Sequence, residues 1–181
     1  MNDGQWRCGA VLVPISGRVP RSVIFVERAP HLRRHPGQIG FPGGIAEPID
    51  AGDPVRTALR EFSEELGVGA ERVRIVGRLP DRQQVSNRFV ITPIVGVLDP
   101  QTRFSVDGEE VVGVITVPLE ALVANGAIRE GAFNYEGRRI WGFTARILKS
   151  FVDAWNEPAS ALRAAVESAI QEGPGRSPFQ R

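Results

Sequence analysis

Three glutamates crowd one short stretch of this sequence, LREFSEELGV at residues 59–68. Glu61, Glu64 and Glu65 stand at spacings that make them neighbours on a helix surface, so their carboxylates face one another. Like charges at this spacing destabilise a helix by roughly 0.2–0.5 kcal/mol per pair, and the macrodipole disfavours anions near a helix C-terminus. The pattern indicates either a divalent cation held by these carboxylates or a solvated acidic face on which Arg60 pairs with Glu64.

A helix that carries these glutamates is predicted by its caps and its apolar pattern. Asp53 is a good N-cap, Pro54 suits the first helical position, and Gly67 is a natural stop. One apolar stripe recurs at helical spacing, formed by Val55, Leu59, Phe62 and Leu66. The glutamates centre roughly 140° from that stripe, so they face away from the expected core.

The segment before this helix is rich in arginine, glycine and proline. Residues 29–54 show no periodicity, and a segment this long is expected to be a functional loop rather than an idle connection. Its arginines precede the acidic helix, and this bipolar arrangement fits a polyphosphate ester, since cations hold outer phosphates while metal ions hold the reacting one. Its glycines allow close approach of the backbone to a ligand. His31 and His35 raise the alternative of zinc, but HEXXH and a third ligand are missing and Pro36 opposes a helix, so a phosphate contact or loop polarity is favoured.

Strands and helices alternate along the rest of the chain. Strands are expected at 8–15, 21–28, 72–79, 88–98 and 109–119, with a short helix at 118–126, a hairpin at 133–142 that turns near Glu136 and Gly137, and helices at 143–155 and 159–172. The mixture predicts an α+β fold with layered packing, in one domain over residues 1–172 and a flexible tail at 173–181. The helices at 143–172 are expected to pack in the core and to form the surface through which a homodimer could assemble.

Composition excludes several classes of function. The 181 residues carry a net charge of +1, which gives no strong field toward nucleic acid or a membrane. No apolar run reaches the roughly 20 residues that span a bilayer, and the N-terminus does not look like a signal peptide. The single Cys8 excludes an internal disulfide and is expected to pack in the core. These features predict a soluble cytoplasmic protein.

The double glycine at 43–44 followed by REFSEELGV at 60–68 resembles the Nudix box. The downstream half of that motif is matched at Arg60, Glu61, Glu64, Glu65, Gly67 and Val68. The resemblance implies an α/β/α sandwich with a mixed sheet, hydrolysis of a nucleoside diphosphate linked to another group, and Mg²⁺ or Mn²⁺ on the three glutamates. It also implies that Arg60 anchors the helix or its carboxylates. The sequence departs from the pattern by two extra residues between Gly44 and Arg60, by Phe62 at an aliphatic position, and by an upstream glutamate replaced by Glu47, Asp50 or Asp53.

A narrower resemblance covers roughly residues 10–150. Arg28-Ala29, Arg33, Gly37 and FPGG at 41–44 have the spacing of the motif that precedes the Nudix box in coenzyme A pyrophosphatases. Similar segments follow at 77–80, 91–96, 110–119 and 135–145, whereas the polar loop 81–90 is less similar. The resemblance implies that substrate is bound by Arg28, Arg33 and Gly37, with Phe41, Gly43 and Gly44 of the FPGG segment.

The implied reaction is metal-dependent cleavage of coenzyme A or its derivatives to 3′,5′-ADP and 4′-phosphopantetheine. Glu61, Glu65 and Glu110 are the candidate catalytic carboxylates, with Glu61 and Glu110 open as general base. Other diphosphates, such as ADP-ribose or a dinucleoside polyphosphate, stay open as substrates, as does a non-catalytic ligand-binding domain. We expect Trp141 to pack in the core or against its hairpin rather than to stack on adenine. Arg138 and Arg139 are expected to be solvated, with a contact to the 3′-phosphate as the alternative.

Overall fold

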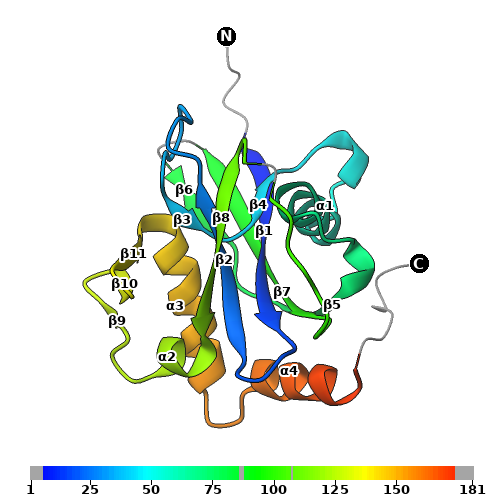
Figure 1. The fold of residues 1–181 in the computed structure, drawn as a ribbon, viewed down its shortest axis with the longest axis vertical. Helices are drawn as coiled ribbons and strands as arrows, with labels where there is room; N and C mark the ends of the chain where they lie inside the picture. Colours follow the sequence, from blue (N-terminus) through cyan, green and yellow to red (C-terminus); the bar gives the residue numbers. More distant parts are fainter. Residues whose placement is uncertain (1–5, 86–87, 107, 174–181) are drawn as a thin grey trace.

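A mixed β-sheet with helices on both faces forms the part of the chain that the computed structural model describes, residues 6–85, 88–106 and 108–173 (Figure 1). The tail expected at 173–181 lies outside these residues, apart from Gly173. The strands of the large sheet are β1 (Arg7–Ser16), β2 (Ser22–Arg28), β3 (Ile39–Gly40), β4 (Gly43–Ile45), β5 (Val73–Arg78), β6 (Arg82–Gln84), β7 (Phe89–Leu98) and β8 (Val111–Pro118). A smaller sheet holds β9 (Ile128–Arg129), β10 (Ala132–Tyr135) and β11 (Arg138–Trp141). The helices are α1 (Pro54–Leu66), α2 (Leu119–Val123), α3 (Gly142–Asn156) and α4 (Ala161–Gln171), with short 3₁₀ turns at Pro48–Asp50 and Ala70–Arg72.

The strand pairing opens a wedge between two strands that are consecutive in sequence. β1 runs parallel to β7 along its whole length, whereas β1 and β2 pair antiparallel at Ile15 and Val23 and then diverge. In the space between them β4 pairs with β1, and β3 pairs with β2. The segment at 29–54, expected to be a loop, therefore contributes two short strands to the sheet. Two or three residues are too few to show a strand periodicity, and the same holds for β6 within the loop at 81–90.

Each face of the sheet has its own core, because successive side chains of a strand point to opposite faces. Ala10 and Leu12 of β1 pack against α1, and Val11 and Val13 lie in the core beneath α3 and α4. Figure 1 shows α1 on one side of the sheet and α3 on the other. This α/β/α arrangement around a mixed sheet confirms the expected fold class.

Helix α1 begins and ends where its sequence predicts. The Asp53 side chain accepts a hydrogen bond from the Val55 amide at 2.8 Å, and Pro54 is the first helical residue. Gly67 ends the helix in the left-handed conformation, with a φ of 64°. Phe62 and Leu66 are fully buried against the sheet, which fixes the direction of the opposite, acidic face.

Two expectations about single residues are wrong. Trp141 is 51% exposed, because its neighbour Ile140 takes the inward direction of β11 and is buried in the core. Cys8 is exposed, since burial along β1 begins only at Gly9. Arg138 and Arg139 are exposed, as expected. Among the described residues, no helix is long and apolar enough to cross a membrane.

Candidate active site

An acidic pocket of about 490 Å³ opens beside the C-terminal half of α1. Its walls come from α1, from the Gly43–Ile45 strand, from the end of β2 and from the turn before β8. The pocket is lined by Arg28, Gly43, Gly44, Ile45, Glu47, Arg60, Glu61, Glu64, Glu65, Glu109 and Glu110. It thus brings together the three glutamates of the helix, both glycines and the candidate base Glu110, which are far apart in sequence.

Glu65 is the most buried carboxylate of this pocket, with 7% of its surface exposed. The Gly43 amide donates a hydrogen bond to its Oε2 at 3.2 Å. Burial, followed by the negative charge of Glu61, raises the pKa of Glu65 to about 8. Burial also raises the pKa of Glu61. A solvated acidic face therefore does not describe Glu65 or Glu61, whereas Glu64 is exposed.

Arg60 organises the entrance of the pocket through a fork of ion pairs. Its Nη1 lies 3.0 Å from carboxylate oxygens of both Glu61 and Glu64. Its Nε and Nη2 donate to the two oxygens of Asp50 at 3.1 and 3.0 Å, and Nη2 also donates to the Ile45 carbonyl. The expected pair between Arg60 and Glu64 is present, but Arg60 holds more than that one partner.

Asp50 is the acidic residue upstream of the helix that binds Arg60. It is 2% exposed, and its hydrogen bonds from Arg60 lower its pKa to about 2 despite burial. Of the other two candidates for the upstream carboxylate, Glu47 lines the pocket and Asp53 caps α1. The left-handed residues Ala51 and Gly52 make the turn between Asp50 and the helix, in the interval that contains the two extra residues. Sequence reasoning offered Asp50 as one of three candidates and did not identify its pairing with Arg60.

The double glycine is required for two different close approaches. A Cβ on Gly44 would lie 2.4–2.6 Å from the carboxylate of Glu61. A Cβ on Gly43 would lie 2.4 Å from the Ala10 carbonyl oxygen, and the φ of Gly43, 152°, disfavours any side chain. Gly43 therefore seats β4 against β1, and Gly44 leaves room for the Glu61 carboxylate.

The donor set of the acidic pocket fits a hard divalent cation. Mg²⁺ and Mn²⁺ prefer carboxylate oxygens, and three helical glutamates line the pocket. Among the described residues, no three acidic, histidine or cysteine side chains are already gathered about one point. Glu61 and Glu64 are turned toward Arg60, while burial and the charge of Glu61 raise the pKa of Glu65 against the opposing effect of Arg28. A bound cation would offset the cost of ionising Glu65 there.

Arg28 lies at the boundary between the acidic pocket and a second cavity. It ends β2, and its buried Nε has no hydrogen-bond partner among the described residues. The Ala29 amide donates to the Glu110 carbonyl at 2.9 Å, which ties the turn carrying Glu110 to the end of β2. A cationic donor and an exposed carboxylate thus stand across from the glutamates of α1.

The second cavity, which we call the aromatic groove, has a volume of about 610 Å³. It lies between the wedge of the sheet and α3, and its aromatic lining residues are Phe41, Phe89, Trp141 and Phe143. Phe41 is mostly buried, and its ring stacks on Phe25 with 4.7 Å between centroids. Sequence reasoning did not foresee that β7, β11 and α3 meet here, because no local pattern links them.

Two residues expected to bind substrate lie outside both cavities. Arg33 and Gly37 are exposed, and neither lines the acidic pocket or the aromatic groove. Gly37 has a φ of 63°, so it serves the turn of this segment. His31 is exposed, while His35 lines the groove with its Nδ1 2.9 Å from Gln38 Oε1, so the two histidines do not form a shared metal site.

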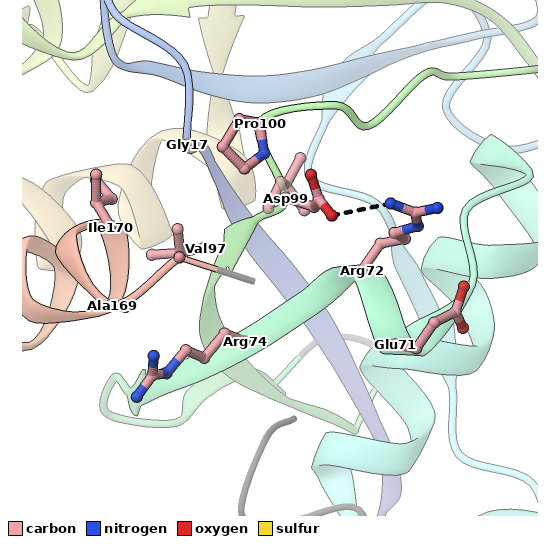
Figure 2. A pocket seen from close by; sticks show the side chains of 11 residues that line it. Gly17, Glu71, Arg72, Arg74, Val97, Asp99, Pro100, Ala169 and Ile170 are labelled. Carbon is pink, nitrogen blue, oxygen red and sulfur yellow. Dashed lines mark hydrogen bonds and ion pairs between the residues drawn. The ribbon is translucent and has the colours of Figure 1, made fainter. Parts of the chain in front are cut away.

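A third depression lies beside α4 and has a volume of about 20 Å³ (Figure 2). The ion pair between Arg72 and Asp99, 2.9 Å apart, forms one wall. This volume holds about one water molecule, so the depression is no substrate site.

Comparison with known proteins identifies the family. The NUDIX domain family matches residues 6–135. An uncharacterized Nudix hydrolase NudL of Yersinia enterocolitica is 36% identical over 159 residues, which cover 81% of this chain and 80% of the relative. NudL of Yersinia pestis is 37% identical over 155 residues, covering 79% and 77%.

Solved structures share the fold at low sequence identity. The NUDIX domain of Shewanella oneidensis NrtR, complexed with ADP ribose, has a TM-score of 0.59 and 13% identity, covering 83% of this chain and 89% of that one. A Nudix hydrolase of Alicyclobacillus acidocaldarius has a TM-score of 0.58 and 19% identity, covering 87% and 96%. The sequence matches, the fold and the pocket around Glu61, Glu64 and Glu65 agree: this chain belongs to the Nudix hydrolases, enzymes that act on nucleoside diphosphate derivatives.

Proposed function

We propose that this enzyme cleaves the diphosphate of coenzyme A or its derivatives to 3′,5′-ADP and 4′-phosphopantetheine, with Mg²⁺ or Mn²⁺ held by Glu61, Glu64 and Glu65. The observation that carries the proposal is the position of Arg28. Arg28 lines both the acidic pocket and the aromatic groove, and its buried Nε has no partner among the described residues, so a diphosphate bound there has its reacting phosphate at the glutamates and its organic group in the groove. The spacing from Arg28 to the FPGG segment, which resembles that of coenzyme A pyrophosphatases, favours coenzyme A over other diphosphates.

The chain's own residues have distinct tasks in this reaction. Arg28 donates to a phosphate oxygen and neutralises charge that develops on the diphosphate. Arg60, locked by Asp50, keeps Glu61 and Glu64 at the pocket entrance. A divalent cation, when bound, lowers the pKa of a coordinated water and neutralises the leaving phosphate.

Hydrolysis needs a group that takes a proton from the attacking water. The water oxygen forms a bond to one phosphorus, the bond from that phosphorus to the bridging oxygen breaks, and the other phosphate leaves as a monoester. Glu61 and Glu110 are the candidates for the proton acceptor, and both line the pocket. Comparing the pH–rate profiles of Glu61→Gln and Glu110→Gln with that of the wild type separates them, since loss of the base removes the acidic limb of the profile.

A product assay tests the proposed substrate. Purified protein is incubated with Mg²⁺ or Mn²⁺ and, separately, with coenzyme A, ADP-ribose, NADH and a dinucleoside polyphosphate, and the products are separated by chromatography. Metal-dependent release of 3′,5′-ADP from coenzyme A, well above the other substrates and absent with a chelator, is the expected result. Turnover of ADP-ribose but not of coenzyme A would reject coenzyme A as the substrate. No turnover of any of these diphosphates would favour a non-catalytic ligand-binding domain.

A further inference from the structure

The aromatic groove differs from the acidic pocket in charge. Its lining residues include Arg28, His35 and Arg146, and no carboxylate is among the described residues that line it. The acidic pocket next to it is dominated by glutamates, and Arg28 lines both. A ligand part that is both aromatic and anionic therefore suits the groove.

Trp141 and Arg146 present the groups that would recognise such a ligand. The indole of Trp141 is half exposed on the groove wall, while the buried Ile140 beside it fixes the strand. The Arg146 guanidinium lies over the Phe143 ring, 4.9 Å from its centroid, on the first turns of α3. The ring holds the guanidinium at the groove while leaving its N–H donors for a ligand.

We propose that the aromatic groove binds the nucleoside half of the substrate, an aromatic base on a ribose that bears an additional phosphate monoester. Trp141 stacks on the base, and Arg146 pairs with the additional phosphate. The assignment rests on the proposed function, because it takes the diphosphate to lie between Arg28 and the glutamates.

The other half of such a substrate fits the groove less well. An amide-rich, neutral chain offers no flat ring to Trp141 and no negative charge to Arg146. Arg146 would then lose water without gaining an anionic partner, which costs free energy. The neutral arm is therefore assigned to the solvent side of the acidic pocket, and the nucleoside to the groove.

Product binding tests this assignment without turnover. Calorimetric titrations in Mg²⁺ buffer compare 3′,5′-ADP, 5′-AMP and 4′-phosphopantetheine on wild type, Trp141→Ala, Trp141→Phe, Arg146→Gln and Arg138→Gln. Arg138 is the matched control, because it is an exposed arginine of β11 that does not line the groove. Both test residues are exposed, and thermal melts verify that each variant folds.

The expected pattern is specific to each residue. Trp141→Ala lowers the affinity for both nucleotides by about tenfold or more. Trp141→Phe restores most of that affinity, because base stacking needs only a flat ring. Arg146→Gln lowers the affinity for 3′,5′-ADP by about tenfold and leaves the affinity for 5′-AMP unchanged, since it removes one charge-assisted pair with the additional phosphate. Arg138→Gln changes the affinity for none of the ligands, and 4′-phosphopantetheine binds to all variants with the same affinity.

Three results overturn the assignment: a loss confined to 4′-phosphopantetheine, an equal effect of Arg146→Gln on both nucleotides, or unaltered binding in Trp141→Ala. These outcomes are distinct from failure of the proposed function. If the binding pattern appears but coenzyme A is not cleaved, the groove assignment stands and the proposed reaction fails. If coenzyme A is cleaved without the pattern, the reaction stands and the groove assignment fails.

Discussion

Glu65→Gln is expected to stabilise the metal-free protein while abolishing its activity. The carboxyl of Glu65 titrates near its ordinary value of 4.5 in the unfolded chain and at about 8 in the fold. Below pH 4.5 both states are protonated, and the stability contributed by the buried neutral carboxyl is fully present. Between pH 4.5 and 8 the unfolded chain releases a proton that the fold retains, so stability falls as pH rises and is lost above about pH 8. Each pH unit in this window is worth about 1.4 kcal/mol, which makes the loss about 3 kcal/mol at pH 7.

Glutamine cannot ionise, so the free energy of unfolding of the variant does not fall with pH from this cause. Urea unfolding in a chelating buffer at pH 5, 6, 7 and 8 measures the free energy of unfolding of both proteins. The difference between them is expected to grow by up to about 1.4 kcal/mol per pH unit in favour of the glutamine variant. Glu61, whose pKa burial also raises, is present in both proteins, so its own burial contributes to both curves.

Divalent metal provides the second arm of this experiment. Mg²⁺ should raise the stability of the wild type much more than that of the variant, because a cation that binds the native carboxylate stabilises the fold by mass action. The raised pKa of buried Glu65 would be refuted if the difference in unfolding free energy between the two proteins stayed constant with pH. A wild type that gains stability from pH 5 to 8 would refute it as well. Near-wild-type turnover by the variant would refute the metal assignment.

Three further substitutions test the frame around the glutamates. Asp50→Asn should lower the free energy of unfolding at pH 7 by about 2 kcal/mol, because the pKa of Asp50 is about 2 in the fold and 3.8 ordinarily. The stability contributed by ionised Asp50 is present above pH 3.8 and is lost as pH falls toward 2. Wild type and variant should therefore converge in acid denaturation curves. A gap that persists at pH 2 would contradict the pairing of Asp50 with Arg60. Gly44→Ala should fold but lose about 100-fold in turnover, because its Cβ displaces the flexible carboxylate of Glu61. Gly43→Ala should lose more than about 1 kcal/mol of stability, because its Cβ meets rigid backbone, so equal melting temperatures for the two variants would count against this distinction.

The acidic helix could be predicted from local sequence because its signals are local. Asp53, Pro54 and Gly67 set its ends, and the stripe containing Phe62 and Leu66 set its buried face. The large strands followed from their apolar runs for the same reason. The burial of Glu65 could not be read from its place opposite that stripe. The polar face of α1 is covered by the Gly43–Ile45 strand, which reaches it through the wedge between β1 and β2.

The aromatic groove marks the limit of the sequence reasoning in a different way. Trp141, Phe89 and Phe143 come from three elements, and only the tertiary fold brings them to one wall. The sequence predicts that Trp141 packs in the core or against its hairpin, but the two-residue period of β11 places Ile140 in the core and leaves Trp141 half exposed. The Arg28 motif was recognised, yet Arg33 of the same motif lies outside both cavities.

The arrangement around Arg60 explains how the fold tolerates the crowded glutamates. Isolated, the acidic face of α1 opposes helix formation through like charges and through the macrodipole. Arg60 balances Glu61 and Glu64 at the entrance, and its two hydrogen bonds to Asp50 hold the guanidinium there. Of the three glutamates of α1, Glu65 is the one that Arg60 does not pair with, and it is the most deeply buried of the three. Burial raises the pKa of Glu65 to about 8, so a divalent cation that binds its carboxylate would offset the cost of the buried charge and release the proton.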